Sequence, residues 1–323
     1  MKQMKKWLLP LLAAALFFSL AACGAKEEEK QSAENEKPKT EEVQKEAYPL
    51  TLKDGLGNEV TIKAKPEKIV SLMPSNTEVT YALGMGDAVV GVNDFDNYPE
   101  EVKDVEKIGG MEFNVEKIVS LKPDVVLADF SNDKAGLQQL KDAGLTVVAV
   151  PAASSFDAVY DSIQFLGKVT GTTEEADKIV QDMQKDLAVI KEKAKTIKEE
   201  DKKKVFAEVS PAPDIYTAGK GSFMDEMITV IGAKNVVDVA EPWPSFAEEK
   251  AVALKPDTII LTYGYYTENA VEQVLARKAW QDVPAVKNKQ VFDIHSDKVV
   301  RPGPRLIEGV EELAKAVYPD VYK

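Results

Sequence analysis

The side chains of this sequence that are best suited to chemistry are aromatic residues and arginines that follow short apolar segments. The aromatic positions are Phe95, Phe130, Tyr216, Trp243 and Tyr263, and the arginines are Arg301 and Arg305. Aromatic rings offer wide apolar faces to a flat ligand, and a guanidinium group binds an anionic group through paired N–H donors. Together these residue types suit the binding of a flat ligand or of an anion.

Trp243 is the most informative of these residues because it stands between two prolines. A loop of this kind is a poor place for a core residue, so the indole is better explained as a surface that stacks on a ligand. For the tyrosines and the arginines, a structural explanation stays open beside ligand contact. At least one of Tyr263, Tyr265 and Tyr266 is expected to pack within its own domain, and either arginine can instead pair with an acidic side chain.

Catalysis is the competing explanation, and an acid pair such as Asp94 and Asp96 would be its best candidate. The sequence holds no nucleophile elbow, no phosphate-binding loop and no zinc-protease motif, and it contains one His and one Cys. Most general-base and metal mechanisms therefore lack their commonest participant. We predict a binding protein that is not an enzyme, with a cell-surface hydrolase as the less favoured alternative.

The elements that must position these residues are organised by a repeat. The segment EKIVSLKPDVVLA (116–128) returns as EKAVALKPDTIIL (249–261). Each copy predicts a short helix that ends at a proline, followed by an aspartate and a β-branched run typical of a buried parallel strand. Further strands are predicted at 68–74 and 204–211, ahead of the two copies. The alternation predicts two similar α/β lobes with mostly parallel sheets.

Other segments complete this organisation. A hairpin is predicted at 50–63, a strand at 145–150, a helix at 155–167, and a closing helix at 302–317. The apolar stripe from Thr172 to about Lys198 predicts one long helix, about 40 Å in length, that joins the lobes. We assign residues 48–170 to the N-terminal lobe, 171–203 to the connecting helix and 204–323 to the C-terminal lobe. A ligand cleft is expected between the lobes, where the loops after the strands meet.

The N-terminus predicts export. Three lysines precede a short apolar run from Trp7 to Leu20, and the sequence LAAC then ends at Cys23. This pattern resembles the lipobox of bacterial lipoproteins, so residues 1–22 are expected to be a signal peptide and Cys23 the lipidated first residue of the mature protein. The polar segment that follows, to residue 47, predicts a disordered tether. Two or three acyl chains would hold the protein stably at a membrane.

The composition agrees with two cores and excludes one class of partner. The chain has 323 residues, 44% of them apolar, and its 54 acids and 41 bases give a formal charge of −13. Its length suggests about two domains. A nucleic-acid partner is excluded because phosphate backbones require a basic surface.

Several segments together resemble one family. They are the run from Pro66 to Val102, the GGM that ends at Met111, both EK…KPD copies, the PWP around Trp243 and RPGPRL at 301–306. These resemble the substrate-binding lipoproteins of ABC importers whose two Rossmann-like lobes are joined by a helical backbone. The resemblance implies a monomer on the extracytoplasmic face of the cell membrane that captures cobalamin, a ferric siderophore or haem. It would deliver this ligand to a permease dimer with ATPase subunits.

Within that family the pattern is most similar to the cobalamin-binding member, which sandwiches the corrin between aromatic residues. The resemblance places Phe95 and Trp243 at aromatic positions, whereas Gly110 and Asp129 stand where that member has tryptophans. A ferric siderophore, bound by the two arginines, and haem, with His295, Met111 or a Tyr as axial ligand, stay open as alternatives. The predicted ligand contacts are Phe95, Met111, Phe130, Tyr216, Trp243, Tyr263, Arg301 and Arg305; no bound metal or cofactor is predicted.

The two copies of the repeat both begin with a carboxylate, Glu116 and Glu249. Acids in a first helical turn are stabilised by the helix dipole, and Ser245 with Glu248 forms a capping-box pattern, so a structural explanation exists. Because they occupy equivalent positions on two similar lobes, the pair would also form two separated, exposed carboxylates on the same side of the cleft. The resemblance implies that they dock on arginines of the permease.

Overall fold

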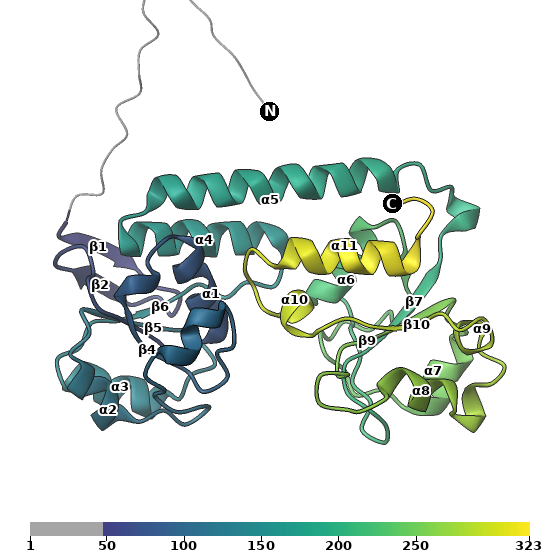
Figure 1. Cartoon of the computed structure of the whole chain (residues 1–323), viewed down its shortest axis with the longest axis horizontal. Helices are drawn as coiled ribbons and strands as arrows, with labels where there is room; N and C mark the ends of the chain where they lie inside the picture. Colours follow the sequence, from purple (N-terminus) through teal and green to yellow (C-terminus); the bar gives the residue numbers. More distant parts are fainter. Residues whose placement is uncertain (1–47) are drawn as a thin grey trace, which may run out of the picture. The chain divides into compact units, whose positions relative to one another are not determined.

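A computed structural model describes residues 48–323 (Figure 1). The predicted signal peptide, Cys23 and the tether to residue 47 lie outside the described residues. Figure 1 shows the described chain as two α/β lobes with helices lying across them. The predicted fold class, two lobes with parallel sheets joined by a long helix, is confirmed.

The N-terminal lobe contains a parallel sheet of order β4-β3-β5-β6. Its strands are β3 (Ile69–Ser71), β4 (Val89–Val92), β5 (Val125–Ala128) and β6 (Val147–Ala149), and the helices that connect them are α1 (Pro74–Ala82), α2 (Val115–Leu121) and α3 (Lys134–Asp142). The central strands β3 and β5 are buried at every residue, which explains their uninterrupted apolar and β-branched composition.

The C-terminal lobe repeats this arrangement. Its sheet has the order β10-β9-β7-β8, so the first strand along the chain again lies between the second and the third. The strands are β7 (Lys204–Glu208), β8 (Lys234–Asn235), β9 (Thr258–Leu261) and β10 (Val291–Asp293). The helices are α6 (Phe223–Val230), α7 (Glu248–Ala253), α8 (Ala270–Leu275), α9 (Pro284–Lys287), α10 (Asp297–Val300) and α11 (Leu306–Val317).

The repeated Lys-Pro-Asp segment has the same structural task in both lobes. Lys122 and Lys255 take left-handed backbone conformations (φ of 51° and 46°) that turn the chain out of α2 and α7. Asp124 then accepts hydrogen bonds of 2.9 Å from the two backbone N–H groups that lead into β3. Asp257 accepts the equivalent bond of 2.9 Å from Lys204, the first residue of β7. Each copy thus fastens the third strand of its lobe to the first.

The predicted hairpin forms a small separate sheet of β1 (Leu50–Lys53) and β2 (Glu59–Ile62), which pair antiparallel. Its turn lies against the end of β6, where the Gly55 N–H donates to the Ala149 carbonyl at 2.7 Å. A Cβ atom at Gly55 would lie 2.6 Å from the Val150 carbonyl oxygen, so only glycine fits this contact. The hairpin therefore caps the edge of the N-terminal lobe.

Two antiparallel helices, α4 (Phe156–Thr170) and α5 (Thr173–Ala194), lie across the lobes (Figure 1). The long helix α5 ends at Ala194 rather than near Lys198, because the chain turns there before β7. The closing helix α11 begins at Leu306, four residues later than predicted, because the proline-rich segment before it is not helical.

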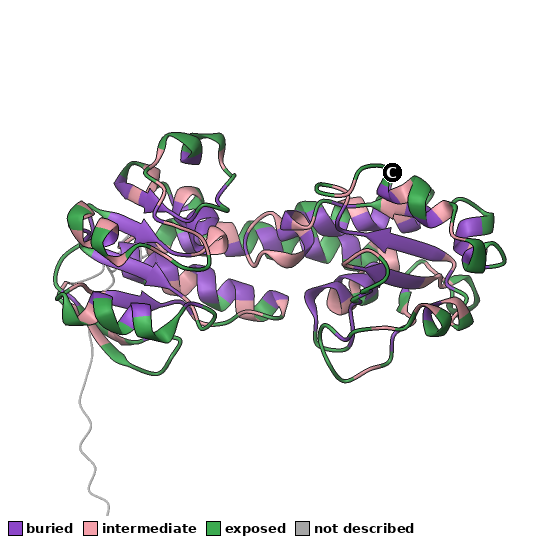
Figure 2. Cartoon of the chain, turned by 90° about the horizontal axis from the view of Figure 1, so that it is seen from below, coloured by how far each residue is buried: buried purple, intermediate pink, exposed green. Residues whose placement is uncertain are grey.

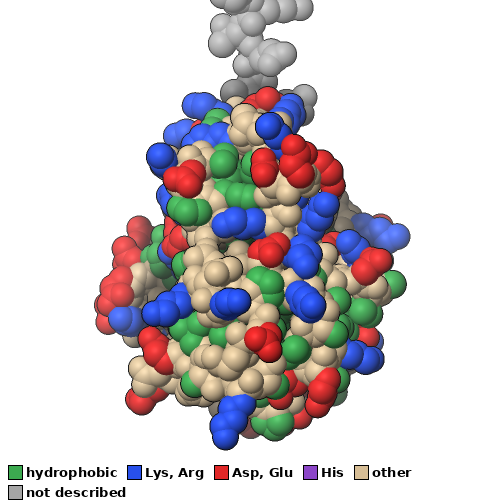
Figure 3. All heavy atoms as spheres, turned by 90° about the vertical axis from the view of Figure 1, so that its right-hand side faces the viewer, with side chains coloured by type: hydrophobic (Ala, Val, Ile, Leu, Met, Phe, Trp, Pro, Cys, Tyr) green, Lys and Arg blue, Asp and Glu red, His purple; other side chains and the backbone are tan. Residues whose placement is uncertain are grey.

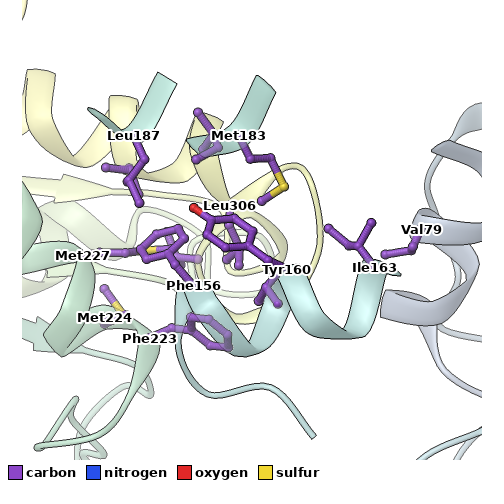
Figure 4. Close-up of a cluster of buried hydrophobic side chains, with 14 of the residues drawn as sticks. Val79, Phe156, Tyr160, Ile163, Met183, Leu187, Phe223, Met224, Met227 and Leu306 are labelled. Carbon is purple, nitrogen blue, oxygen red and sulfur yellow. The ribbon is translucent and has the colours of Figure 1, made fainter. Parts of the chain in front are cut away.

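Apolar side chains from both lobes meet on α4. Figure 4 shows Val79 of α1 beside Ile163 of α4. At the other end of α4, Phe156 lies beside three residues of α6: Phe223, Met224 and Met227. Met183 and Leu187 of α5 lie above them. The rings of Phe156 and Phe223 are in edge-to-face contact at 6.5 Å. Figure 2 shows that buried residues extend from the two sheets into the helices between them. The lobes therefore share one apolar core through α4 and α5.

One polar group in this core has no partner. The Tyr160 hydroxyl, which Figure 4 shows on the side of α5, makes no hydrogen bond, although the residue is only 6% exposed. Burial raises the pKa of Tyr160 to about 12, so the group is neutral at physiological pH. An unsatisfied buried hydroxyl costs stability, on the order of 1–3 kcal/mol.

We therefore expect Tyr160→Phe to raise the free energy of unfolding, by about 1 kcal/mol, in urea denaturation. Tyr322→Phe is the matched control, because the buried Tyr322 hydroxyl donates to the Ile231 carbonyl at 2.9 Å. The same change at residue 322 should lower the free energy by about 1 kcal/mol. Equal losses at both positions would show that Tyr160 has a partner that the structure does not reveal.

Candidate functional site

A cavity of about 520 Å³ lies between the lobes. It is lined by α1, by the loop after β5, by residues 150–154, by the start of α6, and by segments around Trp243 and Arg301. The volume falls within the range of small-molecule pockets, about 300–1,000 Å³. Most of the lining is apolar or uncharged, and its charged residues are Asp129 and Arg301.

Three of the predicted ligand contacts meet at this cavity: Phe130 from the N-terminal lobe, and Trp243 and Arg301 from the C-terminal lobe. The Phe130 and Trp243 side chains are 62% and 37% exposed. Two large exposed rings on opposite sides of one cavity make its lining a candidate ligand surface. The prediction for these two rings rested on their loop positions, and the structure brings them to one cavity.

Further predicted contacts lie on exposed loops outside the cavity lining. Phe95, Met111 and Tyr216 are all exposed, and the Phe95 ring lies over Gly110. A Cβ atom at Gly110 would be 3.2 Å from that ring, so the glycine allows the close approach. Asn93 fixes this loop, because its side-chain amide donates to the carbonyls of Leu72 and Gly110 at 3.0 Å each.

The prediction for Tyr263 is wrong. Its ring is 1% exposed, and its hydroxyl donates to Glu208 at 2.6 Å. Glu208 is fully buried and also pairs with Arg277 at 2.6 Å, which forms a buried polar triad below the loop. Burial, together with the charge of Glu208, raises the pKa of Tyr263. Tyr265 and Tyr266 are the exposed rings of this loop, as expected if one of the three tyrosines packs internally.

The two arginines do not point freely into the cleft, because both pair with Glu78 of α1. Arg305 binds this carboxylate with Nε at 2.8 Å and Nη2 at 2.5 Å, and Arg301 adds a contact from Nη1 at 3.0 Å. The Glu78 side chain is 3% exposed. The alternative that the arginines pair with an acid is therefore correct, but the acid is buried and belongs to the other lobe.

Asn97 and Asp297 extend this network. The Asn97 side chain accepts from Arg301 Nη1 at 2.8 Å and donates to Asp297 at 2.9 Å, and Asp297 pairs with Arg301 at 3.0 Å. We call Glu78, Asn97, Asp297, Arg301 and Arg305 the interlobe ion cluster. Sequence reasoning missed Glu78 as a partner, because it lies 223 residues from Arg301. The proximity of these residues is set by the fold rather than by a local pattern.

The comparisons with known proteins agree with this geometry. Residues 69–298 match the periplasmic binding protein family. The chain belongs to this family. It is 50% identical, over 98% of both chains, to an uncharacterized ABC transporter substrate-binding lipoprotein of Bacillus subtilis, YvrC.

Two solved structures share this fold. A possible iron-binding, periplasmic solute-binding protein of Staphylococcus epidermidis is 36% identical, with a TM-score of 0.70, over 79% of this chain and 100% of that one. The vitamin B12-binding protein BtuF of Vibrio cholerae is 28% identical, with a TM-score of 0.67, over 78% of this chain and 97% of that one. The predicted resemblance to substrate-binding proteins of ABC transporters is thus confirmed.

Two features are absent from residues 48–323. No group of three or more His, Cys, Asp or Glu side chains is placed to hold a metal ion in this part of the chain. Among the same residues no helix has both the length and the apolar character of a membrane span.

The predicted docking acids lie at corresponding places in this substrate-binding protein. Glu116 and Glu249 are exposed in the first turns of α2 and α7, which Figure 1 shows on the side of the lobes away from α5. The capping-box explanation is wrong for α7, because Ala247 precedes its first turn and no side chain caps it. Glu248 instead accepts a bond of 2.7 Å from the Trp280 indole.

Asp96 is the unusual acid of the loop after β4. It is 5% exposed and neither carboxylate oxygen has a hydrogen-bond partner. Burial raises the pKa of Asp96 to about 6, and nearby Thr77, Lys107 and Arg301 offset only part of this effect. Because an unfolded Asp has a pKa of about 3.9, the folded protein holds this proton more tightly between about pH 4 and pH 6. Ionisation of Asp96 therefore lowers stability as the pH rises through that window.

We expect Asp96→Asn to be more stable than the wild type above about pH 6, because Asn cannot ionise. The gain should shrink as the pH falls toward about 4, measured by urea unfolding across this range. Asp94→Asn, at an exposed neighbouring position, is the matched control. Its stability relative to the wild type should not increase as the pH rises. A pH-independent difference for Asp96→Asn would contradict the assignment.

Proposed function

We propose that this protein captures cobalamin in the cleft between its lobes and delivers it to the permease of an ABC importer. The observation that carries the proposal is the pair of exposed rings, Phe130 and Trp243, that line one cavity from opposite lobes. A corrin is wide, flat and largely uncharged, so its faces can stack on such rings. The ligand is bound and passed on without chemical change.

The charges of the cleft support a ligand without strong negative charge. The interlobe ion cluster contains two arginines, but Glu78 and Asp297 balance them. The other charged residue of the cavity lining, Asp129, is an acid. An anionic ferric siderophore would meet no net positive charge there, whereas cobalamin does not need one.

Haem is less well supported because its iron requires an axial ligand. His295 packs on Tyr265 with ring centroids 5.2 Å apart, and its Nδ1 accepts the Asp297 N–H at 3.3 Å. His295 is also not among the residues that line the cavity. A ferric chelate remains the second candidate, since the Staphylococcus epidermidis neighbour is described as a possible iron-binding protein.

The ligand is tested by titrating the protein with cyanocobalamin, haem and a ferric siderophore, using calorimetry. We expect sub-micromolar cobalamin affinity, about −8 kcal/mol or better. Trp243→Ala and Phe130→Ala should each weaken binding about tenfold or more, because each removes a stacking face.

Leu56→Ala is the control, since Leu56 is an exposed apolar residue in the β1–β2 turn outside the cavity lining. Its cobalamin affinity should equal that of the wild type. Binding of a ferric siderophore, with no cobalamin binding at micromolar concentration, would replace cobalamin by the second candidate.

The proposal includes anchoring and docking. The lipobox-like sequence at Cys23 would tether the mature protein to the extracytoplasmic face of the membrane, and the Bacillus subtilis relative is named a lipoprotein. Glu116 and Glu249 would then contact basic pockets on a permease of two subunits, which works with ATPase subunits. Exposed ion pairs contribute little energy, about 0.2–1 kcal/mol each, so these acids would set orientation and capture rate.

We expect the double variant Glu116→Arg, Glu249→Arg to keep its fold and cobalamin affinity but to abolish uptake into cells. The control reverses Glu174 and Glu175 instead, which are exposed in the first turn of α5 on the opposite side of the molecule. It should transport normally at equal protein levels. Normal uptake by the Glu116 and Glu249 double variant would remove the docking function.

A further inference from the structure

The interlobe ion cluster borders the ligand cavity. Arg301 lines the cavity together with Val300 and Pro302, and Val79, the neighbour of Glu78 on α1, lines it from the other lobe. The cluster is therefore close enough for its charge to act on a bound ligand.

The donors of Arg301 are almost completely used. Its Nη1 donates to Glu78 at 3.0 Å and to Asn97 at 2.8 Å. Its Nη2 contacts the Phe95 carbonyl at 3.3 Å and Asp297 at 3.0 Å. Both terminal nitrogens are thus held by protein groups, through three hydrogen bonds and one ion pair.

Arg305 is held in a similar way. Its guanidinium group binds both oxygens of Glu78 and lies 4.1 Å from the centre of the Tyr98 ring. Desolvation by burial acts to lower the pKa of Arg305, and the Glu78 carboxylate more than offsets it. Glu78 is thus the group that both arginines share.

The charges around this group balance. The cluster has two acids, Glu78 and Asp297, and two bases. Asp96 and Lys107, which lie next to the cluster, add one charge of each sign. Because the pairs are poorly exposed, solvent screens them weakly, so loss of one acid would leave an excess positive charge beside the cavity.

We infer that Glu78 is a specificity-determining residue that makes the cleft select ligands without a free carboxylate. By pairing with Arg301 and Arg305 it cancels their charge, and it occupies a donor of Arg301, the arginine that lines the cavity and would otherwise bind a carboxylate of the ligand. This inference deepens the proposed function and rests on it, because it concerns the ligand of the same cleft.

The repeat supplies a matched control. Glu226 occupies in α6 the place that Glu78 has in α1, and it also reaches across the lobe boundary, where it accepts the Phe156 N–H at 3.0 Å. That partner is a backbone group without charge. Glu226→Gln therefore tests the effect of removing an interlobe carboxylate without releasing an arginine.

The experiment compares two ligands of almost equal shape, cyanocobalamin and its monocarboxylate, in which one side-chain amide is hydrolysed to the acid. The measured quantity is the ratio of their affinities, by calorimetry, in wild type, Glu78→Gln and Glu226→Gln. In Glu78→Gln the acid should gain on the order of tenfold relative to the amide, and the gain should shrink in high salt. Glu226→Gln should keep the wild-type ratio.

A purely structural function of Glu78 would change both affinities equally and leave their ratio unaltered, which would overturn the inference. The double variant Glu78→Gln, Arg305→Gln restores the charge balance and should return the ratio to the wild-type value; failure to do so would also count against the inference.

If the wild type does not bind cyanocobalamin, the proposed ligand is wrong. The same ratio is then measured with ferrichrome, a neutral ferric chelate, and ferric citrate, and an unchanged ratio in Glu78→Gln there overturns the inference.

Discussion

The structure depends on an apolar core that does not stop at the lobe boundary. Ile69 and Val125 of the N-terminal sheet and Val205 and Ile260 of the C-terminal sheet belong to the same buried cluster, which passes through α4 and α5. Separating the lobes would expose this surface, at about 25 cal/mol for each Å² of apolar area. The cleft therefore has a width that packing largely fixes, and its ligand surfaces are formed before a ligand arrives.

The interlobe ion cluster adds a directional interaction between the lobes to this apolar packing. Apolar packing is not directional, whereas the two bonds from Arg305 to Glu78 require one geometry of the carboxylate and the guanidinium group. The cluster borders the cavity at Arg301, and at another place on the lobe boundary the Phe156 backbone N–H donates to the Glu226 carboxylate. The same position of the repeat thus holds the lobes together twice, once with charge and once without.

Local patterns predicted most of the fold, because strands and helices here follow the periodicity of their own residues. The repeat at 116–128 and 249–261 revealed both lobes, and the structure explains its Asp as a clamp on the neighbouring strand. Helix ends were less accurate where the turn chemistry is not local, as at Ala194. For the candidate site, loop position predicted the exposure of Trp243 correctly and that of Tyr263 wrongly.

The failures at the site share a physical cause. Tyr263 is buried because Glu208 and Arg277, distant in the sequence, complete a polar triad with it. The arginines are occupied because Glu78 comes from the other lobe. A buried charge must find a counter-charge, but the sequence does not say which one the fold will bring to it.

The similarity of the lobes has a consequence for delivery. Glu116 and Glu249 occupy equivalent places in the first turns of α2 and α7, whereas the cavity lining differs between the lobes, with Asp129 and Phe130 on one and Trp243 and Arg301 on the other. A permease of two identical subunits would accept such a receptor in either of two orientations that differ by half a turn. Half of all arrivals would then present the ligand reversed, and a transport path along the twofold axis would be indifferent to the reversal. Under the proposed docking, this equivalence would double the fraction of productive collisions without any gain in binding energy.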